Sequence, residues 1–181
     1  MQNETSTIAR LKVLFAGVCS LILVMGIARF AYTPLLPVMV DEAGLSHAGG
    51  GWLAAINYAG YLSGVLIAAR VGNAVLKDRL YRWGMVVAVF STAMMAVSTD
   101  FYIWALSRFI AGLCTAAGLM IGGGLILNWL MRNQHRSELG IQCFGIGFGI
   151  AISAFASILM HSYLYWDMNW SVLTGFGCVL V

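Results

Sequence analysis

Charged residues are scarce in this sequence. Only 9% of its 181 residues are Asp, Glu, Lys or Arg, whereas soluble domains carry about 25%. Hydrophobic residues make up 61%, and the mean hydropathy is +0.87. So few charges cannot cover a water-facing surface, so we expect a lipid bilayer around most of the chain. The net charge of +3 is scattered, without a basic run and interleaved aromatic residues, which argues against a nucleic-acid partner.

Cysteine and proline are also rare, with four and two residues. The cysteines are far apart and show no CxxC or other metal-ligand spacing, so we expect no metal, no cofactor, and buried apolar thiols: Cys19, Cys114, Cys143 and Cys178. Pro34 and Pro37 both fall in the first apolar stretch, where each removes a backbone donor. They form either a tolerated bend or the hinge of an outer gate.

Catalytic motifs are lacking. The segment Gly60-Tyr61-Leu62-Ser63-Gly64 is the nearest match to the nucleophile turn of an intramembrane serine protease, and its spacing is wrong. The three histidines fall at or beyond predicted helix ends: His47, His135 and His161. No HExxH motif or paired carboxylates occur. We therefore expect no catalytic residues and no enzyme activity.

Long apolar stretches are what the sequence does contain. A helix needs about 20 apolar residues to cross the hydrocarbon core of a bilayer. We predict a polar tail over residues 1–12 and a transmembrane bundle over residues 13–181, with helices at about 13–40, 50–69, 83–98, 101–131, 140–163 and 169–181. The last contains too few residues to span. The predicted fold is an all-α membrane protein with five complete crossings and an incomplete sixth helix.

The loop charges predict the orientation. One side of the predicted membrane carries all of the loop Lys and Arg residues: Arg10, Lys12, Arg70, Lys77, Arg79, Arg82, Arg132 and Arg136. The other side carries acidic residues instead: Asp41, Glu42, Asp100 and Asp167. The positive-inside rule then predicts a multi-pass protein of the bacterial inner membrane with a cytoplasmic N-terminus. The six tryptophans fall at predicted helix ends, where indole rings prefer the headgroup level: Trp52, Trp83, Trp104, Trp129, Trp166 and Trp170.

Small residues recur at four-residue spacing within the predicted helices. Such residues let helix backbones approach closely in lipid. We expect helix packing at Gly60 and Gly64 in the second helix, Gly112 in the fourth, and Gly145 and Gly149 in the fifth.

Two arginines fall within predicted membrane helices, Arg29 near the middle of the first and Arg108 in the outer third of the fourth. A charge at such depth usually faces protein or a water-filled cavity. Each guanidinium either bonds backbone carbonyls, for example those freed by the two prolines, or binds an anionic substrate. Weaker substrate-binding candidates are Asn57, Tyr58 and Tyr61.

Two segments permit comparison with a known family. Arg108-Phe109-Ile110-Ala111-Gly112-Leu113 resembles the fourth-helix signature of the major facilitator superfamily. Gly26-Ile27-Ala28-Arg29-Phe30-Ala31-Tyr32-Thr33-Pro34-Leu35-Leu36-Pro37 resembles the opening of its YbfB-like branch. The second loop departs from the superfamily pattern, because Gly72, Asp78 and Arg79 give only a stretched match. The fifth helix lacks the Gly-Pro typical of antiporters.

This resemblance implies the N-terminal six-helix bundle of a major-facilitator fold, with a C-terminal six-helix half missing from the chain. It also implies a secondary transporter of a small solute that works by alternating access. The first and fourth helices line the cavity in such proteins, so Arg29 and Arg108 would bind substrate from opposite walls. Because neither has an acidic partner, we expect a small organic anion. The alternatives are a truncated, non-transporting fragment and a half-size protein that acts as a homodimer.

Overall fold

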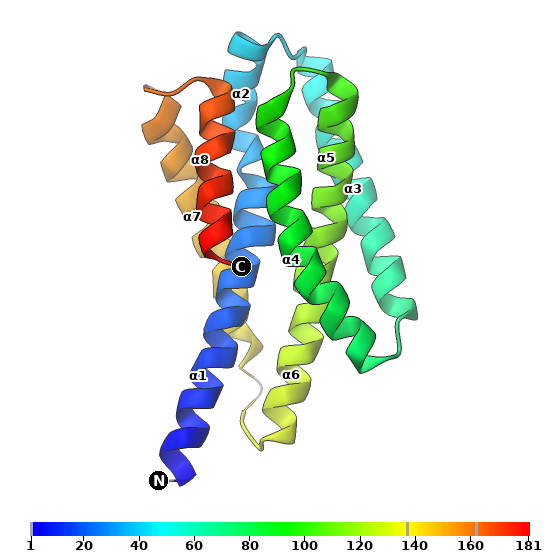
Figure 1. The fold of residues 1–181 in the computed structure, drawn as a ribbon, viewed down its shortest axis with the longest axis vertical. Coiled ribbons are helices and arrows are strands. Elements are labelled where there is room, and N and C mark those ends of the chain that lie inside the picture. The colour runs from blue at the N-terminus through cyan, green and yellow to red at the C-terminus, as the bar shows by residue number, and fades with distance from the viewer. Residues whose placement is uncertain (1, 137, 162) are drawn as a thin grey trace.

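The computed structural model describes residues 2–136, 138–161 and 163–181, without the side chains of residues 2–6 and 161. The expectation for the His161 side chain therefore lies outside the described residues. Helices and short connections make up the described chain, and no strand occurs in it (Figure 1). The predicted all-α fold is confirmed.

The helices form six consecutive rods. The first rod contains α1 (Gln2–Leu21), the π-helix η1 (Ile22–Phe30) and α2 (Tyr32–Ala43). Next come α3 (His47–Arg70) and α4 (Ala74–Val97). The fourth rod contains α5 (Phe101–Ala116), the π-helix η2 (Ala117–Gly122) and α6 (Gly123–Arg132). The last two are α7 (Leu139–His161) and α8 (Trp166–Val179).

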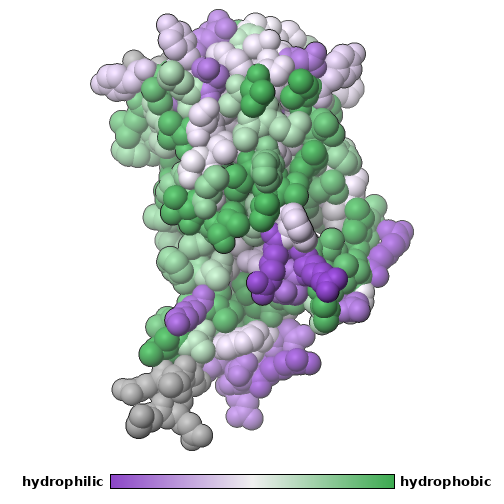
Figure 2. Space-filling model, in the orientation of Figure 1, coloured by the Kyte–Doolittle hydropathy of each residue, from purple (hydrophilic) through white to green (hydrophobic). Residues whose placement is uncertain are grey.

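Five rods within the described residues are long and apolar enough to cross a membrane: Thr7–Ala43, His47–Arg70, Ala74–Val97, Phe101–Arg132 and Leu139–Met160. Helix α8 has 14 residues and is not among them. Figure 2 shows a hydrophobic band between two hydrophilic ends. The basic end is where α1 starts and α3 ends; the acidic end is where α2 ends and α3 starts (Figure 1).

Two predicted boundaries differ from the structure. Residues 70–82 were expected to form a loop, yet α4 already begins at Ala74. The Asn73 side chain caps this helix by accepting hydrogen bonds from Val75 N and Leu76 N, and Arg82 Nε donates to Asp78 Oδ2 at 2.9 Å. Charged residues therefore extend the helix rather than interrupt it. The expected N-terminal tail is likewise helical from Gln2 onward. The remaining boundaries differ by three residues or fewer.

Glycines lie where the helices touch most closely. Gly60 of α3 and Gly112 of α5 face each other's backbones, so that a Cβ on Gly60 would meet the Phe109 carbonyl. A Cβ on Gly64 would lie 2.7 Å from Ala116 Cβ. On the other side of the bundle, a Cβ on Gly145 would lie 2.6 Å from Val18 O, and one on Gly149 2.9 Å from Ile22 Cα. The first rod is thus packed against α7, and α3 against α5.

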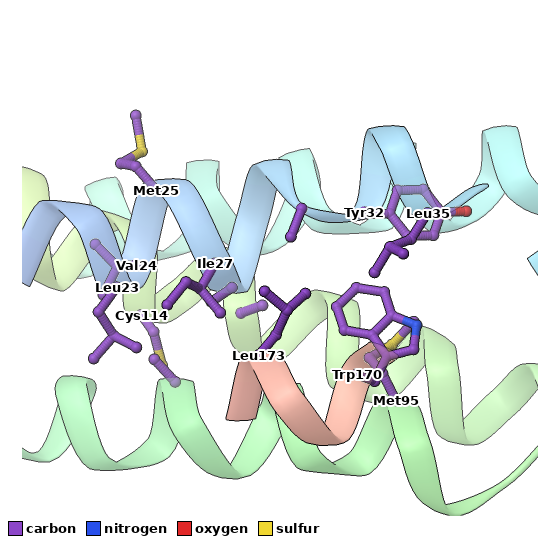
Figure 3. Packing of buried hydrophobic residues seen from close by; sticks show 14 of the residues in the cluster. Leu23, Val24, Met25, Ile27, Tyr32, Leu35, Met95, Cys114, Trp170 and Leu173 are labelled. Atoms are coloured by element: carbon purple, nitrogen blue, oxygen red, sulfur yellow. The ribbon is translucent and has the colours of Figure 1, made fainter. Parts of the chain in front are cut away.

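The main hydrophobic core surrounds η1 and α2. In Figure 3, Trp170 and Leu173 of α8 point toward Leu35 and Ile27 of the first rod. Trp170 is 1% exposed and contributes to this core. Trp170 and Trp104 both lie near the starts of their helices, and their rings pack against protein. The expected burial of cysteine is wrong at Cys143 and Cys178, which are exposed.

Polar contacts at the acidic end connect α2 to α8. Helix α2 stops at Gly44, whose φ of 72° is the left-handed conformation that glycine adopts readily. Trp166 N, at the start of α8, donates a hydrogen bond to Glu42 Oε2 at 2.7 Å. The Trp166 ring also stands edge-on to Trp104 of α5 at 5.8 Å between centroids. These contacts hold α8 beside the first and fourth rods.

Candidate functional site

Arg29 lies on the π-helical segment η1 and is buried, with 8% of its surface exposed. Its guanidinium carbon is 4.6 Å from the centroid of the Tyr58 ring, 4.7 Å from Tyr61 and 5.4 Å from Phe30. We call these three rings the aromatic cluster. Within the described residues, the Arg29 side chain has no hydrogen bond and no ion pair. Its charge is therefore stabilised by ring faces, while its N–H groups stay free for a ligand.

The tyrosines reach Arg29 because of how α3 packs. Tyr58 and Tyr61 are three residues apart and so lie on one side of the helix. Because Gly60 has no side chain, α3 packs closely against α5, and the middle of α3 lies close to η1. Tyr58 is 54% exposed and Tyr61 is half-buried. The structure thus places both predicted tyrosines beside Arg29, on a side of α3 that remains partly open.

Arg108 of α5 is held differently. It is 2% exposed, and its guanidinium stacks 4.6 Å from the centroid of the Tyr32 ring. Nη1 donates to Ala28 O at 2.7 Å, and Nη2 donates to Arg29 O at 3.0 Å. We call this pair of bonds the carbonyl clamp. The buried Nε has no partner among the described residues. Two of the three guanidinium nitrogens of Arg108 thus donate to backbone carbonyls.

The backbone of η1 explains why the Arg29 carbonyl accepts a side-chain donor. In a π-helix, an N–H group bonds the carbonyl five residues earlier, as Ala31 N does to Gly26 O at 2.8 Å. Pro34 follows Arg29 by five residues and has no N–H to offer. Arg108 supplies a donor to the Arg29 carbonyl instead. The hydroxyl of Thr115, also on α5, lies 3.2 Å from Val24 O in the same segment.

A second layer of hydrogen bonds joins the helices around both arginines. Asn57 Nδ2 of α3 donates to the carbonyl of Arg108 at 2.8 Å. The Tyr32 hydroxyl donates to Gly50 O at 2.9 Å. The structure therefore places Asn57 with its amide on α5 rather than toward Arg29. Pro34 and Pro37 lie in α2, directly after the π-helical segment.

Several carboxylates at the two ends of the bundle are bonded there. Glu138 pairs with Arg10, and Asp78 pairs with Arg82. At the acidic end, Asp100 Oδ1 accepts from Tyr102 N at 2.8 Å as the cap of α5. These contacts leave the two membrane arginines without a carboxylate partner in the described part of the chain.

Three cavities lie away from the arginines. One of about 310 Å³ includes Lys77 and Asn128, and an apolar one of about 230 Å³ includes Trp83 and Cys114. A third of about 410 Å³ is lined by Tyr81, among others. Neither arginine lines any of these three cavities.

Comparison with known proteins assigns the family. The model of the family described as "Uncharacterised MFS-type transporter YbfB" matches residues 21–181. The chain belongs to this family. The predicted membership is thus confirmed, and η1, α5 and both arginines lie inside the matched residues.

A curated relative agrees. The chain is 28% identical over 97 residues to the "Uncharacterized MFS-type transporter YceJ" of Bacillus subtilis (strain 168). The match covers 54% of the chain and about a quarter of the relative's length.

Sequence reasoning missed several parts of the site. It did not identify Tyr32, which stacks on Arg108, or Thr115, which reaches η1. It also did not predict the two π-helices. A usable signal was present, since Gly26 and Pro34 flank Arg29 and both weaken a regular helix.

Proposed function

We propose that this family member acts in secondary active transport of a small organic anion by alternating access, with Arg29 as the residue that binds the anion. A second six-helix half would supply the opposite wall of the cavity, as the fold of such transporters requires. The basic end would face the cytoplasm of a bacterial cell whose inner membrane holds the protein.

The free guanidinium of Arg29 is the observation that carries this proposal. A cation buried in a membrane bundle is costly unless it is neutralised or functional. Here the aromatic cluster stabilises the charge without consuming its N–H donors. An anion that arrives at these donors gains charge-assisted hydrogen bonds, and a guanidinium binds carboxylate or phosphate in a two-pronged geometry.

The other predicted residues take graded roles in this proposal. The rings of Tyr58 and Tyr61 would lie beside the bound anion and contact the apolar part of the solute. Asn57 and Arg108 are oriented toward backbone groups, which favours a supporting role over direct contact. Pro34 and Pro37 lie in α2 beyond the site, where a hinge would let the outer half of the first rod move separately.

Transport by the full-length protein in proteoliposomes tests the proposal. The probes are radiolabelled benzoate, succinate and lactate, compared between wild type, Arg29→Ala and Arg29→Lys. We expect saturable uptake of at least one anion by wild type, none with alanine, and a raised KM with lysine. Arg132→Ala, at the exposed end of α6, is the matched control and should transport normally. Uptake that both Arg29 variants leave unchanged, or wild-type protein that transports none of the three anions, would contradict the proposal.

A further inference from the structure

The two arginines are connected through the backbone that carries one of them. The carbonyls that Arg108 binds belong to Ala28 and Arg29 itself. We propose that Arg108 is a positioning residue: its guanidinium holds η1 in the π-helical form that keeps the Arg29 side chain against the aromatic cluster. The functional meaning of this position depends on the anion binding proposed above, whereas the positioning itself can be measured without any ligand.

The geometry of the clamp suits arginine and no other side chain. Two neighbouring carbonyls are met by two different nitrogens of one planar group, at 2.7 and 3.0 Å. A lysine ammonium is a point charge on a flexible stem and has no fork with which to hold two acceptors in a fixed relation. The Tyr32 ring covers the guanidinium and keeps it in one plane.

The π-helical segment depends on donors from outside its own helix. Pro34 cannot supply an N–H to the Arg29 carbonyl, and Arg108 Nη2 on α5 is the donor there. Carbonyls without donors are costly inside a membrane bundle, so removing the clamp favours a change of helical register. Converting a π-bulge to α-helix removes about one residue from the turn and rotates the flanking side chains by about 100°. Arg29 would then turn away from α3.

A further hydrogen bond connects Arg108 to the helix that carries the two tyrosine rings. Asn57, one residue before Tyr58, donates to the Arg108 carbonyl at 2.8 Å. One residue, Arg108, therefore contacts the backbone of η1 through its side chain and the helix of the tyrosines through its carbonyl. Arg29 and its aromatic cluster are both positioned relative to this single point of α5.

Chemical footprinting of Arg29 in the full-length protein tests the inference. Phenylglyoxal modifies guanidinium groups, and peptide mass spectrometry gives a rate for each arginine. The variants are Arg108→Gln and Arg108→Lys, and the matched control is Ser107→Ala. Ser107 is a buried neighbour on the same helix that donates to Ser91 O and does not bond η1. Arg70 and Arg132, exposed at helix ends, serve as internal standards for reagent and fold.

In wild type, Arg29 should react slowly, since it is 8% exposed and covered by rings. We expect Arg108→Gln to raise its rate roughly tenfold, because two charge-assisted hydrogen bonds that oppose local opening are lost. Arg108→Lys should also raise the rate, since charge without the fork does not restore the clamp. Ser107→Ala should leave it at the wild-type value.

Several results would overturn the inference. These are an Arg29 rate that neither Arg108 variant changes, a lysine variant that behaves as wild type, or a Ser107→Ala variant as reactive as Arg108→Gln. If Arg108→Gln is not recovered folded, Arg108→Lys alone carries the test, because it keeps the charge and removes the fork that holds both carbonyls. No rise of the Arg29 rate in that variant would then refute the positioning.

The footprint and the transport assay fail separately. Loss of anion uptake in Arg29→Ala together with an unchanged Arg29 footprint in the Arg108 variants would retain the proposed function and refute the positioning. A changed Arg29 footprint in the Arg108 variants, without any anion uptake by wild type, would retain the positioning and refute the proposed function.

Discussion

Arg29 and Arg108 lie in neighbouring membrane helices, and their surroundings differ. Arg108 donates to two backbone carbonyls and stacks on one ring. The Arg29 guanidinium contacts three rings and has no hydrogen-bond partner among the described residues. Depth in the bilayer therefore does not identify a binding residue. What separates a structural cation from a candidate ligand site is whether its N–H groups are already bonded.

The largest effect on stability is expected for Arg108→Ala. Two buried carbonyls lose charged donors, which should lower the free energy of unfolding by about 2–6 kcal/mol. Arg29→Ala should lower it by less than about 2 kcal/mol, because only ring contacts are lost. Unfolding in detergent, followed by circular dichroism, measures both variants. Equal losses in the two would remove the distinction between the arginines.

A smaller effect is expected for Gly60→Ala, which forces α3 away from α5. The new Cβ meets the Phe109 carbonyl, and this should cost about 1–3 kcal/mol of stability. Gly147→Ala is the matched control on α7, where a Cβ meets nothing within 4 Å. That control should be neutral or slightly stabilising, because alanine favours helix over glycine. Because Gly60 lies between Asn57 and Tyr61, the substitution should also disturb both arginine sites.

The fold could be predicted from sequence because its determinants are local. Runs of apolar residues set the membrane helices, and residues such as Gly60 and Gly112 signal close packing through spacing alone. The start of α4 was misjudged because charge was taken as a loop signal, whereas Asn73 caps a helix that continues through Lys77 and Arg82. Here a capping residue was more informative than the charges after it.

The site was predictable only in part, because its assignments depend on contacts between distant residues. Both arginines were identified from charge at membrane depth, which is a local signal. Their different environments depend on a bond between Arg108 and a carbonyl 80 residues away, which no local pattern encodes. Likewise, Trp104 at a predicted helix end gave no sign that its ring would be buried by Met95 and Trp166.

A third prediction separates stability from binding at Arg29 itself. Arg29→Gln should lower the free energy of unfolding by about 1 kcal/mol. It should also reduce anion affinity by roughly tenfold or more, since a charge-assisted pair is lost. Thermal unfolding with and without benzoate measures both quantities. The control is Arg132→Gln, at the exposed end of α6, which should leave both unchanged. A large stability loss with intact benzoate affinity would reverse the roles assigned to the two arginines.

The smallest effect is expected for the ring of Tyr58, whose face is 4.6 Å from the Arg29 guanidinium carbon. Tyr58→Leu keeps an apolar side chain and removes the ring, which should cost about 0.5–1 kcal/mol. Tyr58→Phe keeps the ring and should cost almost nothing, because the contact uses the face and not the hydroxyl. A double-mutant cycle with Arg29→Gln isolates this contact, since the loss from Tyr58→Leu should disappear once the cation is gone. If Tyr58→Leu costs the same with or without the cation, the ring acts on Arg29 only as packing. The free guanidinium of Arg29 would then lack the cation–π stabilisation assigned to the Tyr58 ring.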